Sequence, residues 1–246
     1  MHGLKSSLDR VFVQQDEQLL ARRIAVCLRV RSGPLWSTNV QHLFGRVFDP
    51  DMRITDLWNR PRTPFAYIMM FSQHTPRDLL YSMREITACA LALGKDPERF
   101  SAEAIKEGVR KACHAAVKRV AGEYSLRLPH ALEIMEAFTD ATALLEYPDA
   151  VHRILQLEPE TLGSLDPARI IDTLYEMGFF GRLVEDQPSP GRQPTPQKVF
   201  EVHYSYTRAE PNFCKTDTLL IHPMFWGRFN IKPPLTGLPP TAKAVD

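Results

Sequence analysis

The chain has 246 residues, of which 44% are hydrophobic and 24% are charged, and its 30 basic and 29 acidic side chains leave a formal charge of +1. This composition is typical of folded globular proteins and excludes the disordered and fibrous classes. No apolar run approaches the ~18 residues that a membrane-spanning helix needs, and no apolar signal core follows the first residues. We therefore expect a cytoplasmic protein without a membrane partner.

The charge is unevenly distributed along the chain. Residues 1–62 contain 10 basic and 6 acidic side chains (net +4), residues 63–187 contain 13 and 19 (net −6), and residues 188–246 contain 7 and 4 (net +3). Two basic ends around an acidic middle suggest modules with different partners, and chance variation of a few charges gives the same pattern.

The first part of the chain has the periodicity of helices. Residues 16–31 place apolar side chains among arginines, which predicts an amphipathic helix, and further helices are expected from Ser37 and near Asp51. The segment 63–72 is apolar enough to be buried. The four arginines of the first helix form either a nucleic-acid stripe or a solvated face that contacts a partner: Arg22, Arg23, Arg29 and Arg31.

The clearest helix is predicted over residues 76–93. Thr75 can cap the free N–H groups of the first turn, and Pro76 suits the first helical position because its missing N–H has no partner there. Apolar residues then recur at helical spacing up to Leu93, and Gly94 provides a C-terminal stop.

Two more long helices are predicted downstream, over residues 102–120 and 129–145. Ser101 caps the first of them and Gly122 ends it, whereas Pro129 begins the second. Three helices of this length with short connections predict a helical bundle.

The pattern changes after about residue 148. Two shorter helices are followed by three candidate strands and a loop rich in Pro and Gly, which is the order of a winged-helix domain. The helices are expected at 149–158 and 167–177, the strands at 181–186, 198–207 and 216–223, and the wing at 187–197. Residues 232–246 are expected to be a disordered, proline-rich tail.

The chain contains no recognisable catalytic motif. It has no Walker A sequence, no GxGxxG, no GxSxG and no HExxH. Its four cysteines form no CxxC pair and have no histidine at zinc-ligand spacing, so we expect reduced thiols in a reducing compartment. The sequence therefore predicts a protein that is not an enzyme and has neither a cofactor nor a metal.

Two motifs carry a resemblance to a known family. The sequences HTPRDLL (74–80) and LLIHPMFWGRFNI (219–231) resemble the C-terminal half of bacterial P-loop ATPases of the STAND/KAP-like type. Pro76-Arg77-Asp78 matches the start of the helical lid of these proteins, and His222-Pro223 matches the end of their winged-helix domain. The resemblance spans roughly residues 60–231.

The nucleotide-binding core of that family, with its Walker motifs, is absent. The resemblance therefore implies either a fragment or a stand-alone descendant that does not hydrolyse ATP, and ATP enters only if a separate P-loop core is present. It also implies a role for Arg77, because a lid arginine can report on the γ-phosphate. The alternative is that Arg77 forms a salt bridge with Asp78 or Glu85.

A winged helix would point to nucleic acid or to protein. In DNA-binding versions the second helix enters the major groove, but the helix 167–177 has only Arg169 beside Asp172 and Glu176. Four basic residues flank the expected wing: Arg182, Arg192, Lys198 and Arg208. So few phosphate contacts predict weak, salt-sensitive DNA binding, and a protein-interaction or spacer module is the alternative.

The sequence as a whole predicts a mainly α fold with a small β component. We expect a basic helical segment (1–62), a lid-like helical bundle (63–147), a winged-helix domain (148–231) and a tail (232–246). The predicted function is a non-catalytic regulatory or interaction module that binds protein partners and, more weakly, nucleic acid. The alternative is a self-contained winged-helix DNA-binding transcription regulator.

Overall fold

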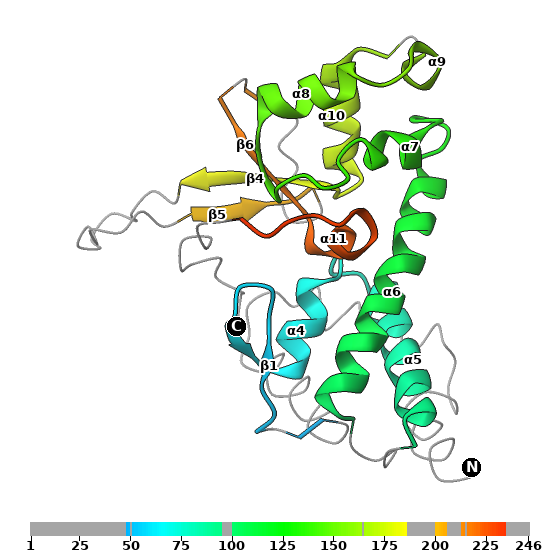
Figure 1. Ribbon diagram of the computed structural model, residues 1–246, viewed down its shortest axis with the longest axis vertical. Helices are drawn as coiled ribbons and strands as arrows, with labels where there is room; N and C mark the ends of the chain where they lie inside the picture. Colours follow the sequence, from blue (N-terminus) through cyan, green and yellow to red (C-terminus); the bar gives the residue numbers. More distant parts are fainter. Residues whose placement is uncertain are drawn as a thin grey trace, which may run out of the picture. The chain divides into compact units, whose positions relative to one another are not determined.

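The computed structural model describes residues 48–49, 51–94, 100–163, 165–185, 200–205, 213–214 and 216–234 (Figure 1). The chain divides into two compact units, Met1–Cys113 and His114–Asp246, with the boundary inside a helix. The described elements are mainly helices with a small antiparallel component, as the sequence predicted. The predictions for residues 16–31, for the helix from Ser37 and for the wing lie outside the described residues.

In its described residues, the first unit contains a two-stranded hairpin and helices that pack against it. Its elements are β1 (Ile54–Thr55), β2 (Pro61–Arg62), α4 (Pro64–Met70), α5 (Pro76–Ala92) and the first half of α6 (Ala102–Glu123). The helix predicted near Asp51 is wrong, because antiparallel strands replace it. Asn59 at the hairpin tip has a φ of 58°, a left-handed conformation that ends any helix.

Helix α5 begins and ends as its sequence predicts. The Thr75 hydroxyl accepts a hydrogen bond from the Asp78 N–H at 3.1 Å, and Gly94 has a φ of 62°, which only glycine adopts without strain. Leu79, Met83 and Ile86 are buried along one face, whereas Leu93, predicted to face inward, is 41% exposed.

Helix α6 packs against α5 without a side chain between the two backbones. A Cβ atom on Gly108 would lie only 2.5 Å from the backbone nitrogen of Ile86, so the absence of a side chain permits this close approach. The helix continues through Gly122 to Glu123, and the stop predicted at Gly122 is wrong. One buried apolar cluster unites the unit, and its largest fully buried members are Ile54, Ile68, Ile86, Phe100 and Ile105.

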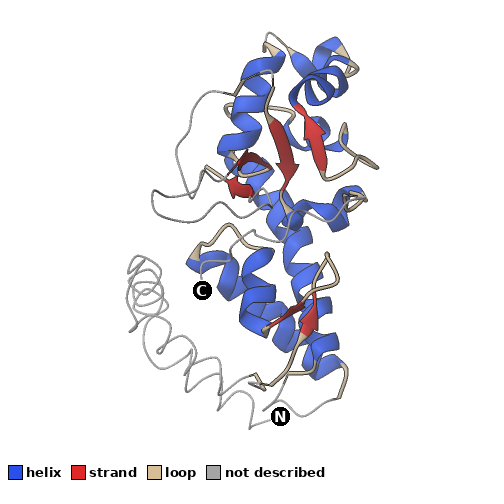
Figure 2. Cartoon of the chain, turned by 90° about the vertical axis from the view of Figure 1, so that its left-hand side faces the viewer, coloured by secondary structure: helices blue, strands red, loops and turns tan. Residues whose placement is uncertain are grey.

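The described residues of the second unit combine the end of α6 and several short helices with a four-stranded sheet (Figure 2). Its helices are α7 (Ala131–Glu136), α8 (Tyr147–Leu155), α9 (Pro159–Leu162), α10 (Pro167–Glu176) and α11 (Pro223–Phe229). Its strands are β3 (Leu144–Glu146), β4 (Phe180–Glu185), β5 (Phe200–His203) and β6 (Thr218–Ile221). Helices α8 and α10 pack against each other, and each also contacts the sheet.

The strands are antiparallel and follow the order β3-β6-β4-β5. Strands β4 and β5 pair as a hairpin, with Leu183 opposite Val202. The last strand, β6, lies between β3 and β4, with Leu220 opposite both Leu144 and Gly181. All three predicted strands are therefore present, but the sequence did not indicate that the last of them is central.

The long helix predicted over residues 129–145 is wrong. Only Ala131–Glu136 is helical, and Asp140 has a φ of 60°, which ends the helical run. The following Leu144 and Leu145 pair with β6 instead. The apolar spacing of this segment fits a helix, but tertiary pairing overrides it, so the predicted bundle of three long helices does not form.

Packed aromatic rings form the core of the second unit. Phe179 lies 4.8 Å from Phe225 and 6.2 Å from Phe229 between ring centroids, and Phe138 lies 5.2 Å from Phe180. All of these rings are almost completely buried, and edge-to-face pairs of this kind add stability beyond the area that they bury.

We expect Gly108→Ala to destabilise the first unit by about 1–3 kcal/mol, because the new methyl group must push α5 and α6 apart. Gly122→Ala, in the same helix, is the matched control: nothing lies within 4 Å of its added Cβ, so it should be neutral or stabilising by up to ~1 kcal/mol. Thermal unfolding measures both. Equal stability of the two variants would contradict this packing.

Candidate functional site

The motif HTPRDLL forms the entry to α5. The buried Asp78 carboxylate accepts a hydrogen bond from the Gln73 N–H at 2.9 Å, while the Ser72 hydroxyl accepts one from the His74 N–H at 3.2 Å. With the Thr75 cap, these bonds fix the chain immediately before the helix. The entry to α5 is therefore rigidly specified by its own polar side chains.

Two features of this entry bear on function. His74 has a φ of 56°, an uncommon conformation outside glycine that tends to occur at functional sites. Arg77 is exposed in the first turn of α5, where the helix dipole is positive and attracts anions. Two carboxylates near Arg77 in the sequence also make other contacts: Asp78 accepts the Gln73 N–H at 2.9 Å, and Glu85 pairs with Arg84 at 2.8 Å. The salt bridge of Arg77 with either of them stays a prediction.

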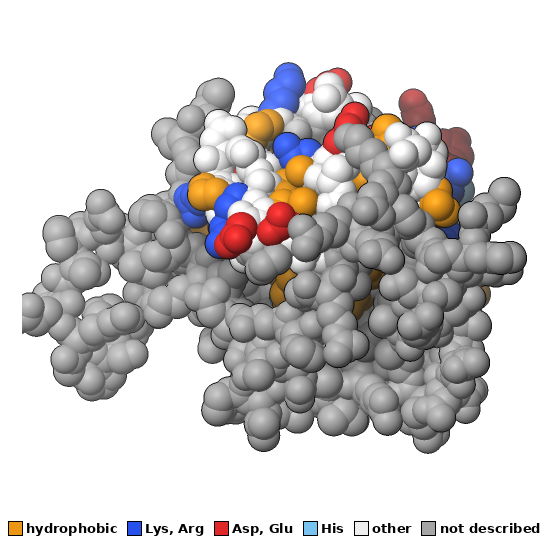
Figure 3. Space-filling view, turned by 90° about the horizontal axis from the view of Figure 1, so that it is seen from below, with side chains coloured by type: hydrophobic (Ala, Val, Ile, Leu, Met, Phe, Trp, Pro, Cys, Tyr) orange, Lys and Arg blue, Asp and Glu red, His pale blue; other side chains and the backbone are white. Residues whose placement is uncertain are grey.

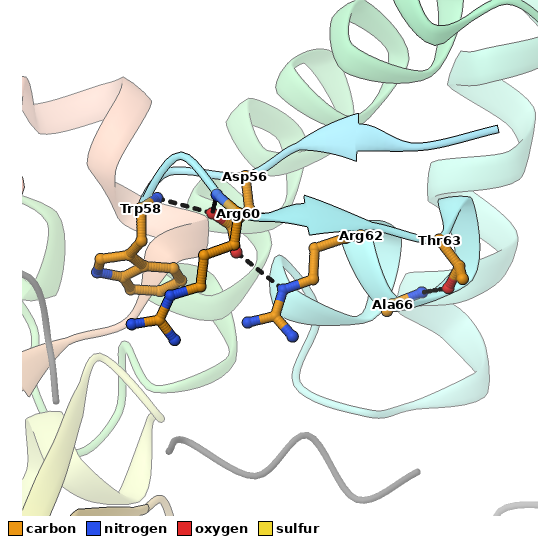
Figure 4. A network of polar contacts seen from close by, with 6 residues as sticks. All are labelled: Asp56, Trp58, Arg60, Arg62, Thr63 and Ala66. Atoms are coloured by element: carbon orange, nitrogen blue, oxygen red, sulfur yellow. Dashed lines mark hydrogen bonds and ion pairs between the residues drawn. The ribbon is translucent and has the colours of Figure 1, made fainter. Parts of the chain in front are cut away.

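A second polar site occupies the β1–β2 hairpin (Figure 4). The side chain of Asp56 is completely buried, and its Oδ1 accepts the N–H groups of Trp58 and Arg60, each at 2.8 Å. Its Oδ2 accepts from Nε of Arg62, also at 2.8 Å. One carboxylate thus holds the whole hairpin tip and orients one arginine.

The arginines of this hairpin share a direction. Figure 4 shows the side chains of Arg60 and Arg62 extending to the same side of the hairpin, with the Trp58 indole beside Arg60. Arg62 lies on β2 and Arg60 lies in the turn directly before this strand.

The interior next to the hairpin is weakly polar. Burial and the nearby Cys113 and Asp56 raise the pKa of Tyr67 to about 12. Burial and, to a lesser extent, the Asp78 carboxylate raise the pKa of the Cys113 thiol to about 12 as well. Both groups are therefore neutral at physiological pH, and neither has the lowered pKa of a nucleophile.

The second unit contains a separate buried cap. Nδ1 of His222 accepts the N–H of Met224 at 3.0 Å, and the ring packs 4.8 Å from that of Tyr204. Acceptance by Nδ1 requires this nitrogen to be unprotonated. The His222-Pro223 pair of the motif therefore starts α11, which is a structural role.

Two of the five candidate phosphate contacts of the second unit lie in the described residues. Arg182 on β4 pairs with Asp217 at 3.0 Å, and the two side chains are only 25% and 10% exposed. Arg169 is exposed on α10. Arg192, Lys198 and Arg208 lie outside the described residues, so whether the five candidates gather on one face stays a prediction.

Helix α10 has an acidic surface. Burial and the neighbouring Glu176 raise the pKa of Asp172, against the opposing effect of Arg169. Burial, Asp172 and Asp166 likewise raise the pKa of Tyr147. A surface on which carboxylates raise the pKa of their neighbours is negative and repels phosphate.

The described part of one face of the molecule is mixed. Figure 3 shows basic, acidic and hydrophobic side chains interspersed on the described part of the face seen from below. Within the described ranges, no group of three or more His, Cys, Asp or Glu side chains could hold a metal ion. Among the same residues, no helix is both long enough and apolar enough to cross a membrane.

Comparisons with known proteins add no assignment. The chain matches no protein-family model, and neither a curated protein nor a solved structure is significantly similar to it.

Sequence reasoning missed the Asp56 hairpin. The signal was present in the segment DLWNRPR (56–62), where Asp and Asn are turn formers and the two arginines are spaced by two residues. The partner of Asp56, however, depends on the antiparallel register of β1 and β2, which no helical or catalytic pattern reveals.

We expect Asp56→Asn to destabilise the first unit by about 1.5–3 kcal/mol, because an amide N–H₂ would face Nε of Arg62 in place of an acceptor. The control is Asp51→Asn, which changes the same charge at an exposed position and should alter stability by less than ~0.5 kcal/mol. Chemical denaturation measures both. A wild-type midpoint for Asp56→Asn would contradict the network.

We expect Cys113 to resist thiol reagents in the folded protein, whereas the exposed Cys214 reacts. With a pKa of about 12, only about one Cys113 in ten thousand is a thiolate at pH 8, and the thiolate is the reactive form. The stability that this thiol contributes should be lost as the pH rises from ~8.5, its unfolded value, toward about 12. Alkylation followed by peptide mass analysis measures the contrast, and equal labelling of the two cysteines would refute it.

Proposed function

We propose that the chain is a non-catalytic regulatory module that resembles the lid and winged-helix region of a P-loop ATPase. In this proposal the first unit senses a nucleotide through Arg77, and the second unit binds a protein partner. The observation that carries the proposal is the entry to α5, where polar bonds fix the backbone and Arg77 stands exposed in the first turn.

The geometry of this entry suits a phosphate sensor. Aligned peptide dipoles place partial positive charge at the start of a long helix, and a guanidinium binds phosphate oxygens bidentately. Because Asp78 and Thr75 fix the preceding loop, Arg77 projects from a rigid base. A rigid base lowers the entropy cost of binding.

The strand topology of the second unit supports a winged-helix assignment. A strand, two main helices and a β-hairpin follow one another, and a later strand, β6, pairs between the first strand and the hairpin. In this assignment the wing corresponds to the connection between β4 and β5. The short α9 is a departure from the simple pattern.

The acidic surface of α10 favours a protein partner over DNA. A recognition helix contacts bases in a groove lined by phosphates. Helix α10 carries three acidic residues, Asp166, Asp172 and Glu176, against one arginine of its own, and Arg127 pairs with Glu176. The alternative function, a self-contained DNA-binding transcription regulator, would depend on the basic residues around the wing. We also propose that the protein is cytoplasmic, because its dispersed cysteines suit a reducing compartment.

The test is calorimetric titration of the purified chain with ATP and ADP. We expect weak binding of ATP that Arg77→Ala reduces at least tenfold, as befits the loss of a charge-assisted hydrogen bond. Arg84→Ala is the matched control, because Arg84 is also exposed on α5 but lies two turns from its start. No binding by the wild-type chain, or equal losses in the two variants, would exclude a nucleotide-sensing role for Arg77.

A further inference from the structure

We propose that the β1–β2 hairpin is a second phosphate-binding element, in which Arg60 and Arg62 together hold a phosphate group of a nucleotide or of a nucleic-acid strand. Neither residue belongs to the motifs that support the proposed function. The inference is independent of Arg77, because other side chains carry it.

Arg62 is oriented before any ligand arrives. Its Nε donates to the completely buried Asp56 carboxylate, while its own side chain remains 24% exposed. A guanidinium has five N–H donors, and one bond through Nε leaves four on the two Nη groups. No other described residue is bonded to those Nη groups, which keep the fork geometry that matches phosphate oxygens.

Arg60 is fixed at the other end of the same network. Its backbone N–H donates to Oδ1 of Asp56, and its carbonyl accepts from the Asp56 N–H at 2.9 Å. The left-handed Asn59 directly before it sets the turn. Figure 4 shows that its side chain extends to the same side as that of Arg62, so the two guanidinium groups lie on one side of the hairpin.

The chemistry of the tip indicates a nucleotide rather than a carboxylate ligand. The segment 51–63 contains three arginines and two aspartates, a net charge of +1, and one of those aspartates is buried. The remaining positive charge suits a group with more than one negative oxygen, such as phosphate. The Trp58 indole lies beside Arg60 (Figure 4), and an aromatic ring next to arginines is the usual means of stacking a base.

The experiment measures binding of ATP, of an oligothymidylate and of duplex DNA by fluorescence anisotropy and calorimetry. We compare the wild-type chain with Arg60→Gln and Arg62→Lys. Arg60→Gln preserves the backbone N–H that bonds to Asp56, and Arg62→Lys preserves the charge while removing the fork. Thermal unfolding of each variant establishes that the hairpin remains folded.

The matched control is Arg53→Gln, which removes the same charge from the same hairpin. Arg53 directly precedes β1, it is exposed, and none of the bonds of the Asp56 carboxylate reaches it. We expect Arg60→Gln and Arg62→Lys each to weaken binding roughly tenfold and Arg53→Gln to weaken it less than about twofold.

Comparison of ATP, the oligothymidylate and duplex DNA identifies the source of the phosphate. Loss confined to ATP assigns the hairpin to a free nucleotide, and loss confined to an oligonucleotide assigns it to nucleic acid. Absence of binding to every probe, or equal losses in Arg53→Gln and Arg60→Gln, would overturn the inference. ATP binding that depends on Arg77 but not on Arg60 or Arg62 overturns this inference alone, and the reverse result overturns only the role of Arg77.

Discussion

The buried Asp56 carboxylate is the polar constraint on which the hairpin of the first unit depends. An ionised carboxylate is stable in an apolar interior only when donors surround it, and three donors converge here from a single hairpin. Two of them are backbone N–H groups, so the requirement fixes the turn itself and not only a side-chain pair. The third donor is Arg62, which consequently projects to the surface in one orientation. The same carboxylate helps to keep Tyr67 neutral, which links the hairpin electrostatically to α4.

Two other polar side chains act at the starts of helices. Thr75 and His222 each accept a backbone N–H two or three residues ahead, and each precedes a proline. The HTPRDLL and LLIHPMFWGRFNI motifs therefore both contain a helix N-cap followed by proline. Proline at the first helical position has no N–H group, so fewer backbone donors need a partner there. The difference between them lies in burial. His222 is enclosed by packed rings, whereas Arg77, beside the other cap, is exposed.

Local sequence predicted those parts of the fold that local physics controls. The start and end of α5 follow from Thr75 and Gly94, and the α10 start follows from Asp166, whose side chain accepts the Ala168 N–H. The alternation in β5 likewise predicted a strand. The predictions failed where a distant segment competed with local propensity. Residues 137–145 have helical spacing, yet Leu144 and Leu145 pair with β6, which lies more than 70 residues along the chain. The candidate site shows the same contrast between local and tertiary control. Arg77 could be found from a local sequence motif, whereas the orientation of Arg62 by Asp56 depends on the pairing of β1 with β2.

The sequence by itself determined the mainly helical class, most helix starts and the strand character of the C-terminal region, because capping side chains and hydrophobic periodicity act over a few residues. The tertiary structure decided which strand is central, where Gly108 lets two helices touch, and which carboxylates are already engaged. It also decided that Arg182 pairs with Asp217 and that Asp56 orients Arg62. These outcomes depend on register and on contacts between residues that are distant in sequence. Local patterns carry no information about such contacts, since the free energy that selects them comes from burial and pairing in the folded chain.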